Sequence, residues 1–166
     1  MNKHLSIVCR AATRDDIPGV LRLYAQPDLD NGKILTLSEA ERHFERMADY
    51  PDYKIHVAFI DTQLIGTFAL LIMDNLAHMG APSAIIEDVA VDPEWQGRGV
   101  GKQMMKYALR ICGEKGCYKA ALSSNLSRKR AHAFYESLDF EQHGYSYRIS
   151  LHRDITTEPP RSAPNY

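Results

Sequence analysis

The chain has 166 residues, of which 45% are hydrophobic and 25% are charged, and its formal net charge is −1 at neutral pH. This profile suits one globular domain with a substantial core and gives no reason to expect nucleic acid or a membrane surface as a partner. No apolar run reaches the ~18–20 residues of a membrane span. Because the N-terminus lacks an apolar signal segment and the three cysteines lack metal spacing, we expect a cytoplasmic protein.

The first third of the chain is expected to form one strand and two helices. Residues 5–9 are a short apolar strand, and residues 13–16 offer N-cap oxygens and first-turn acids to a helix. The apolar stripe of that helix, spaced i, i+3, i+4, i+7, is Ile17, Val20, Leu21 and Tyr24. After a loop at 26–36, a capping box at 38–41 predicts the start of the second helix. Its apolar face is Ala40, Phe44, Met47 and Ala48.

The middle of the chain is expected to be rich in strands. Residues 54–60 and 64–73 are joined by a tight turn, which makes them an antiparallel hairpin. Residues 84–91 are a run of apolar and β-branched residues, typical of a buried strand. Pro93 ends this strand, because proline cannot donate to a sheet ladder.

Three glycines at alternate positions, 97, 99 and 101, follow this strand and lead into a helix. Glycines allow the backbone to approach a ligand closely, and the unpaired N–H groups and dipole of a helix start favour negative charge. The sequence therefore predicts an anion site. The Walker pattern fails because Gln103 follows the Gly-Lys pair, and the dinucleotide pattern fails because Met104 stands where its last glycine belongs.

The last third is expected to add a strand at 118–123, a helix at 128–138 and a closing strand at 140–151. A helix connects the strand at 84–91 to the strand at 118–123. Such a crossover implies parallel neighbours and a right-handed connection, whereas the hairpins are antiparallel. The sheet is therefore expected to be mixed.

Two motifs resemble one known family. The run E-D-V-A-V, followed by Q-x-x-G-x-G, is similar to motif A of the GNAT superfamily of acyl-CoA N-acyltransferases. The run S-x-N-x-x-R-x-x-A-H-x-F-Y, at 123–135, resembles the region after the fifth strand of many members. One departure is Asp139, where many members have glycine. Because Asp can adopt the left-handed conformation at some cost, this departure affects the end of a helix and not the chemistry.

The resemblance implies an α/β (α+β) domain over residues 1–153. Its sheet would be mixed, mostly antiparallel and twisted, with a central parallel strand pair and about four flanking helices. Residues 154–166 contain prolines and little that could pack, so we expect a disordered tail. The resemblance also implies acetyl-CoA as the acyl donor and no metal. The implied cofactor-binding positions are Val89, Ala90, Val91, Gln96, Gly97, Arg98, Gly99, Val100, Gly101, Lys102, Asn125, Ala131, Phe134 and Tyr135.

Acyl transfer from a thioester to an amine needs a deprotonated amine, stabilisation of the oxyanion and a proton for the departing thiolate. In the family, a phenol on the helix after the fifth strand gives that proton, and Tyr135 is the matching position. Tyr135 also lies on an apolar stripe and could be plain core. Glu87 is the candidate base, directly or through water, although it could equally pair with a cation. Strand alternation predicts that Glu87 and Asp88 lie on opposite faces.

The expected function is direct acetyl transfer from acetyl-CoA to a primary amine of a small molecule. Amino sugar phosphates, aminophosphonates, amino acids and polyamine-like acceptors are left open, as is a homodimer. The alternatives are acetylation of protein lysines or N-termini, and a non-catalytic acyl-CoA-binding module. Acceptor specificity is expected to reside in the segments 26–36, 74–83 and 142–147.

Overall fold

The computed structural model describes residues 6–149 and contains one five-stranded sheet in the order β1-β2-β3-β4-β5. Neighbouring strands are antiparallel except for β4 and β5, which are parallel. The expected mixed sheet, hairpin and parallel pair are therefore confirmed. The strands are β1 (Ile7–Ala11), β2 (Tyr53–Ile60), β3 (Gln63–Met73), β4 (Ser83–Val91) and β5 (Lys119–Ala121).

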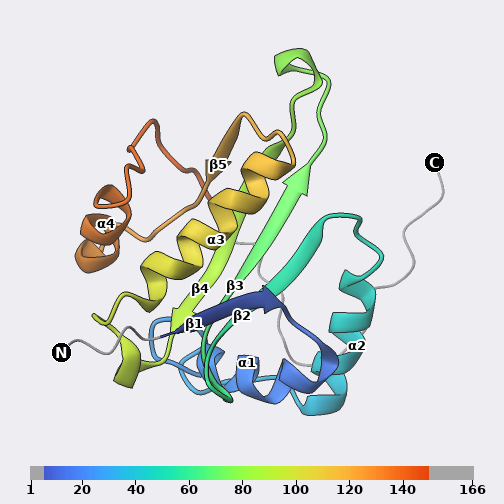
Figure 1. Cartoon of the computed structure of the whole chain (residues 1–166), viewed down its shortest axis with the longest axis vertical. Helices are drawn as coiled ribbons and strands as arrows, with labels where there is room; N and C mark the ends of the chain where they lie inside the picture. Colours follow the sequence, from blue (N-terminus) through green and yellow to red (C-terminus); the bar gives the residue numbers. More distant parts are fainter. Residues whose placement is uncertain (1–5, 150–166) are drawn as a thin grey trace.

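Among the described residues, four α-helices cover this sheet: α1 (Ile17–Tyr24), α2 (Leu37–Met47), α3 (Val100–Glu114) and α4 (Lys129–Glu136). Three short 3-10 turns lie at Arg14–Asp16, His78–Gly80 and Pro93–Trp95. Helix α3 crosses one face of the sheet with α4 beside it, while α1 and α2 lie on the other side (Figure 1). Within residues 6–149, none of the helices combines the length and apolar character that crossing a bilayer requires.

The two faces of the sheet carry separate apolar clusters. On the face covered by α3, Phe68 and Ile65 pack with Met104 and Met105, all fully buried. On the opposite face, Leu23 of α1 belongs to a smaller cluster that also contains strand residues. The expected stripe of α1 is thus present, although Leu23 is more deeply buried than the stripe residues named from the sequence. The sheet itself divides the interior into two compartments.

The entry to α1 is held by one buried carboxylate. Both Asp16 oxygens accept hydrogen bonds from Arg10, at 2.6 and 2.9 Å, and the Thr13 backbone N–H donates to one of them at 2.7 Å. The hydrogen bond from Arg10, assisted by those from Thr13, lowers the pKa of Asp16 against the opposing effect of burial. The carboxylate therefore stays charged and joins β1 to the first helix.

Helix α2 begins two residues earlier than the sequence pattern indicated. Its N-cap is Thr36, whose Oγ1 accepts a hydrogen bond from the Glu39 N–H at 3.3 Å, while Glu39 accepts from the Thr36 N–H at 2.9 Å. The expected capping box at 38–41 was therefore wrong in position. After the C-terminal end of α4, Asp139 adopts φ 65°, the left-handed conformation that aspartate can adopt at some cost.

The expected closing strand at 140–151 is not formed over residues 140–149, and its last two residues lie outside the described range. The alternating side chains of Tyr145, Tyr147 and Ile149 are 89%, 91% and 82% exposed. Alternation makes a strand only where a neighbour can pair with it. Since β5 is only three residues long, the sheet edge nearest in sequence offers little to pair with. The predicted tail at 154–166 also lies outside the described residues.

His56 of β2 is buried, with its ring stacked on Phe68 at a centroid distance of 5.0 Å and its Nδ1 without a hydrogen-bond partner. Burial, with a smaller effect of Lys54, lowers the pKa of His56 from 6.5 to about 4. The imidazole is therefore neutral in the folded protein. The unfolded chain binds the proton more tightly, so acidification favours unfolding between these two pKa values.

We predict that replacing His56 with Phe reduces the loss of stability on acidification. Between about pH 6.5 and pH 4, the wild type loses up to about 3 kcal/mol through this histidine, because each pKa unit corresponds to about 1.4 kcal/mol. Urea unfolding at about pH 7 and pH 4.5 measures the loss in each protein. Carboxylates such as Asp16 contribute equally to the loss of stability in the wild type and in the variant. Equal losses in the two proteins would therefore contradict the lowered pKa of His56.

Candidate active site

The site originates where β4 and β5 part. Their parallel pairing runs only from Ser83 opposite Lys119 to Ile85 opposite Ala121, whereas β4 continues to Val91. Beyond Ile85, one side of β4 is therefore free of its neighbour. The position of this opening follows from the short length of β5.

A β-bulge lies in β4 at the same level. The register with β3 pairs Glu87 with Ala69 and Ala90 with Thr67, so that Asp88 and Val89 together face one residue. Asp88 takes φ 52°, a left-handed conformation that is uncommon for a residue other than glycine. A bulge bends its strand and turns side chains away from the usual alternation.

A cleft of about 200 Å³ opens beside the bulge, and we call it the polar cleft. It is lined by Leu29, Ile86, Glu87, Asp88, Val89, Leu122, Ser123, Arg128 and Tyr135. The expectation that Glu87 and Asp88 lie on opposite faces is therefore wrong, because the bulge interrupts the alternation between them. The structure brings the two predicted catalytic residues, Tyr135 and Glu87, to one cleft.

Tyr135 reaches the polar cleft from α4. Its ring packs against Phe134 and Phe140, at centroid distances of 5.1 and 5.8 Å. Burial raises the pKa of the Tyr135 phenol, and Arg128 opposes this only in part. The phenol is consequently protonated at neutral pH and can donate a proton within the cleft. The Tyr135 side chain therefore both packs against other aromatic rings and lines the polar cleft.

Asp88 experiences a different environment. Burial raises the pKa of its carboxyl, and the negative charges of Glu87 and Asp30 raise it further. The side chain nevertheless stays accessible from the cleft. A carboxylate with a raised pKa is a better proton acceptor than an ordinary surface acid.

The glycine loop lies at the far end of β4. Gln96 Nε2 donates to the Val91 carbonyl at 3.2 Å, which closes the loop onto the strand. Gly97 and Gly99 have φ of 72° and 84°, and a Cβ at either would face open space. Immediately after Gly99, α3 begins at Val100 with its first N–H groups unpaired within the helix. This is a cradle into which a phosphate group fits.

At several of the predicted cofactor-binding positions, the side chain packs inside the protein and does not face a ligand. Val100 is 1% exposed and Ala90 is 4% exposed, so only their backbone groups could meet a ligand. A Cβ at Gly101 would lie 3.0 Å from the Phe134 ring, so this glycine allows α4 to approach α3. Phe134 is part of that contact and packs on the core cluster.

The remaining predicted positions lie around the loop and before α4. Arg98 lies over the Trp95 ring, 5.1 Å from its centroid, and Lys102 is exposed on the first turn of α3. Asn125 shapes the segment before α4: its Oδ1 accepts from the Ser127 N–H at 2.9 Å, and its carbonyl is 2.9 Å from His132 Nε2. Ala131 is half-buried on α4.

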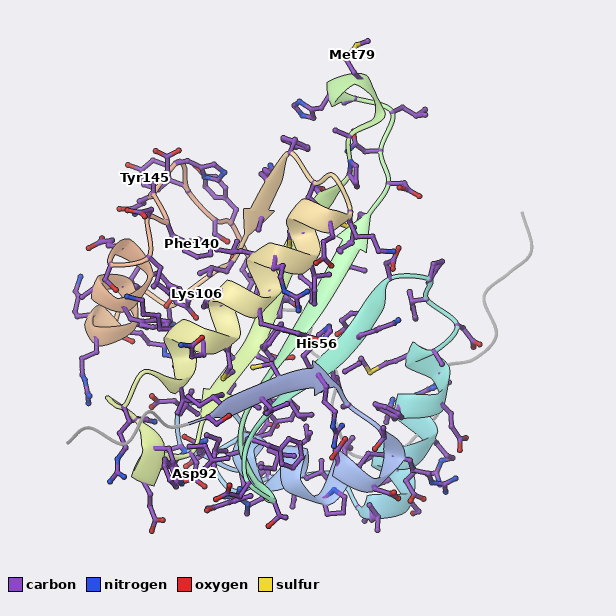
Figure 2. The ribbon with its side chains drawn as sticks, viewed as in Figure 1. His56, Met79, Asp92, Lys106, Phe140 and Tyr145 are labelled. Carbon is purple, nitrogen blue, oxygen red and sulfur yellow. The ribbon has the colours of Figure 1, made fainter. Side chains whose placement is uncertain are left out.

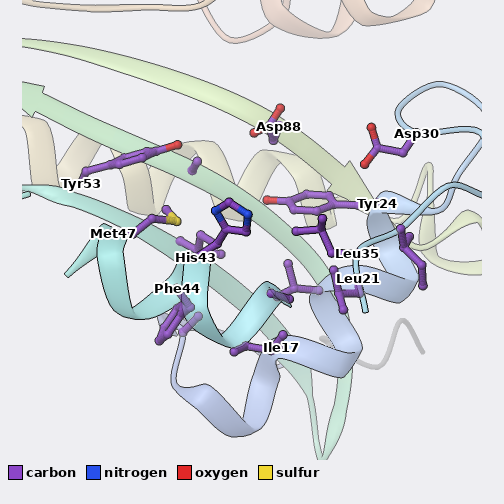
Figure 3. A pocket seen from close by; sticks show the side chains of 16 residues that line it. Ile17, Leu21, Tyr24, Asp30, Leu35, His43, Phe44, Met47, Tyr53 and Asp88 are labelled. Carbon is purple, nitrogen blue, oxygen red and sulfur yellow. The ribbon is translucent and has the colours of Figure 1, made fainter. Parts of the chain in front are cut away.

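A second hollow of about 190 Å³, the apolar pocket, lies on the sheet face covered by α1 and α2 (Figure 3). Asp88 lines it as well as the polar cleft, and so connects the two. The apolar pocket is lined by Ala12, Ile17, Val20, Leu21, Tyr24, Asp30, Ile34, Leu35, Ala40, His43, Phe44, Met47, Tyr53, Ile55, Ala69 and Asp88. The segment 26–36, one of three expected to bear specificity, contributes to it.

Sequence reasoning did not identify most of this pocket, since its residues come from two helices, a loop and several strands. It also gave no role to Arg128 beyond its place in a motif. The segment 74–83 contributes no lining residue, and Met79 lies at the far tip of the β3–β4 connection (Figure 2). Within residues 6–149, no group of three or more His, Cys, Asp or Glu is placed to hold a metal ion.

Comparison with known proteins identifies the family to which this chain belongs. The model of the Acetyltransferase (GNAT) family matches residues 16–140, so the chain belongs to this family. It is similar to glucosamine 6-phosphate N-acetyltransferase of Trypanosoma brucei brucei, with 35% identity over 54% of this chain and 58% of that protein. It is also similar to L-amino acid N-acetyltransferase of Escherichia coli, with 26% identity over 64% of each chain.

The chain spans less than two thirds of the length of either of these curated relatives. A solved structure, glucosamine-6-phosphate N-acetyltransferase of Arabidopsis thaliana, superposes with a TM-score of 0.74 at 26% identity. That match covers 90% of this chain and 99% of the other. The architecture of the whole described domain is therefore that of the family.

Proposed function

We propose that this protein transfers the acetyl group of acetyl-CoA directly to a primary amine of a small molecule. One observation supports the proposal most: a single cleft holds a protonated phenol together with two carboxylates, and one of these carboxylates also lines the apolar pocket. The curated relatives are named as N-acetyltransferases of small amines, which agrees with this chemistry. A pocket of about 190 Å³ also suits a small acceptor better than a protein segment.

The cradle at Gly97 and Gly99 fits the pyrophosphate of acetyl-CoA, because its backbone is open to a ligand and is followed by a helix start. Arg98 and Lys102 flank it and would offset phosphate charge. Val89 and Val91 continue from the cleft toward the loop and offer backbone groups along the free edge of β4. Acetyl-CoA supplies the acetyl group as an activated thioester.

The residues of the cleft then divide the proton transfers between them. A carboxylate takes one proton from the acceptor ammonium, because only the free amine has a lone pair for attack on the thioester carbonyl. As the new C–N bond forms and the C–S bond breaks, the nitrogen loses its second proton to water, and the carboxylic acid later releases the first proton to solvent. Tyr135 gives a proton to the departing sulfur, and its phenolate regains one from solvent.

Two carboxylates could accept the first proton. Glu87, the residue favoured from the sequence, lines the polar cleft, but Asp88 lines both the cleft and the apolar pocket. Asp88 therefore lies where an amine in the pocket would meet an acyl group in the cleft. We propose Asp88 as the first proton acceptor and Glu87 as the alternative.

Gly99→Ala should weaken acetyl-CoA binding, because a methyl group would occupy the space in which the pyrophosphate approaches the backbone. Gly116→Ala is a matched control: Gly116 has φ 73° and open space at the other end of α3. Both changes introduce similar backbone strain, about 1–2 kcal/mol. Isothermal titration calorimetry with acetyl-CoA should therefore show a loss only for Gly99→Ala, and equal affinities in both variants would refute the pyrophosphate assignment.

Tyr135→Phe should slow the chemical step by about 10²-fold, the lower end of general-acid effects, because a thiolate leaves fairly well unaided. The ring keeps its contacts with Phe134 and Phe140, so stability should change by only about 1 kcal/mol. Single-turnover rates measure this step without interference from product release. A wild-type single-turnover rate in the variant would reduce Tyr135 to a core residue.

Asp88→Asn should remove the acid limb of the pH–rate profile, and Glu87→Gln should preserve it. The carboxyl accepts a proton only when ionised, so the wild-type rate rises with pH through the raised pKa of Asp88. Single-turnover rates across pH compare the two isosteric variants. The reverse pattern would assign the base to Glu87, and an acid limb in both would point to water or another group.

The other expectations remain proposals. We infer a cytoplasmic enzyme that needs no metal and that binds neither nucleic acid nor membrane, and its assembly as a homodimer stays open. A non-catalytic acyl-CoA-binding module would bind acetyl-CoA but release no thiol with any amine. The cleft residues argue against this alternative, because a module has no use for an acid and a base that share one cleft.

A further inference from the structure

We propose that the acceptor is a cationic amine with an uncharged apolar or aromatic body, which lies in the apolar pocket with its ammonium group at Asp88. This inference rests on the proposed function and narrows its acceptor class. It departs from the phosphorylated amino sugar that appears in the names of two similar proteins.

The size and lining of the pocket fit such a body. Its volume, about 190 Å³, exceeds that of an apolar cavity of about 150 Å³ that binds benzene. A six-membered ring or a short branched chain can therefore enter. The wall away from Asp88 is formed by apolar side chains, among them Leu21, Leu35, Phe44 and Met47 (Figure 3). Such a surface gains from contact with an apolar body and offers nothing to a hydrated anion.

Several polar groups of the pocket point toward its middle. The hydroxyl groups of Tyr24 and Tyr53 point toward the middle from opposite sides, with Asp88 on the strand beside them and His43 on α2 (Figure 3). Burial and the charge of Asp88 raise the pKa of both phenols, so both remain neutral hydrogen-bond partners. An ammonium group placed here would meet one carboxylate and two phenol oxygens.

The charges of the pocket have one sign. Asp30 and Asp88 are its acidic residues, and neither Lys nor Arg is among the described residues that line it. Arg128 lies in the polar cleft, on the side proposed for acetyl-CoA. A phosphate or carboxylate in the apolar pocket would therefore face like charges, with no Lys or Arg among the described lining residues to neutralise it, which selects against acceptors that carry one.

Matched amines test this inference with the full chain. Phenylethylamine and phenylalanine share a ring and differ by one carboxylate, and glucosamine and glucosamine 6-phosphate differ by one phosphate. Thiol release from acetyl-CoA gives kcat/KM for each amine. We expect kcat/KM for phenylethylamine to exceed that for phenylalanine by about tenfold or more. We also expect kcat/KM for glucosamine 6-phosphate to be lower than that for glucosamine. Higher kcat/KM for glucosamine 6-phosphate than for glucosamine and phenylethylamine would overturn the inference.

Variants place a positive charge inside the pocket. Phe44→Lys should lower kcat/KM for phenylethylamine by about tenfold or more and should reduce the discrimination against phenylalanine. Ala48→Lys adds the same charge to the exposed end of the same helix, outside the pocket, and should leave both values unchanged. If Phe44→Lys does not fold, Leu35→Lys in the preceding loop serves instead, because Leu35 is 44% exposed and tolerates a polar group.

Calorimetry with acetyl-CoA distinguishes a failure of the inferred acceptor class from a failure of the proposed acetyltransferase function. A protein that binds acetyl-CoA and acetylates glucosamine 6-phosphate best would retain the proposed function and lose only the inferred acceptor class. A protein that binds no acetyl-CoA would contradict the proposed function. Equal phenylethylamine kinetics in Phe44→Lys, Leu35→Lys and Ala48→Lys would show that the amine body lies elsewhere, and would also overturn the inference.

Discussion

The bulge at Asp88 is the constraint on which the rest of the site depends. A left-handed conformation at a residue other than glycine costs of order 1–3 kcal/mol and persists only where the surrounding structure enforces it. Here the antiparallel ladder with β3 resumes at Ala90, and it holds the extra residue in place. Without the bulge, β4 would alternate regularly, and Glu87 and Asp88 would point to different faces. With it, both carboxylates line the polar cleft and one of them also reaches the apolar pocket.

The glycines at 97, 99 and 101 are regularly spaced but have two different structural roles. Gly97 and Gly99 leave their Cβ side empty, as a ligand-binding backbone requires. Gly101 instead makes room for the ring of Phe134, and through it α4 lies against the start of α3. Since Tyr135 follows Phe134, the same contact that packs the two helices also sets the position of the phenol. Open backbone at two glycines and close packing at the third therefore occur within a few residues of one motif.

Local sequence patterns predicted much of the fold. The hairpin, the buried β4 strand, the crossover by α3 and the stripe of α4 all rest on periodicity and turn residues, which act over short distances. The closing strand failed because Tyr145, Tyr147 and Ile149 alternate without a neighbour to pair with, and pairing is not a local property. The start of α2 was misplaced because Thr36 and Ser38 are both good N-cap residues and only the backbone chooses between them.

The site was predicted unevenly for the same reason. Tyr135 and Glu87 were placed by motifs, and they do meet in one cleft. Their relation to Asp88 was missed, because a bulge depends on the register between two strands and not on either sequence alone. The apolar pocket has no linear signature either: Tyr24 comes from α1, His43 from α2 and Tyr53 from β2. Tyr24 was rightly placed on an apolar stripe, and nothing in the stripe showed that its hydroxyl lies near a carboxylate.

The ion pair between Arg22 and Asp92 connects the two halves of the site. Arg22 of α1 contacts the Asp92 carboxylate at 2.6 Å and the Leu64 carbonyl at 2.7 Å, while the other Asp92 oxygen accepts from the Glu94 N–H at 3.1 Å. Asp92 is buried directly after β4, where the chain turns toward the glycine loop. Any shift of α1 relative to β4 must therefore carry this carboxylate with it or break the pair. A displacement of α1 beside the apolar pocket is in this way coupled to the start of the glycine loop through one ion pair, whose two residues line neither the apolar pocket nor the polar cleft.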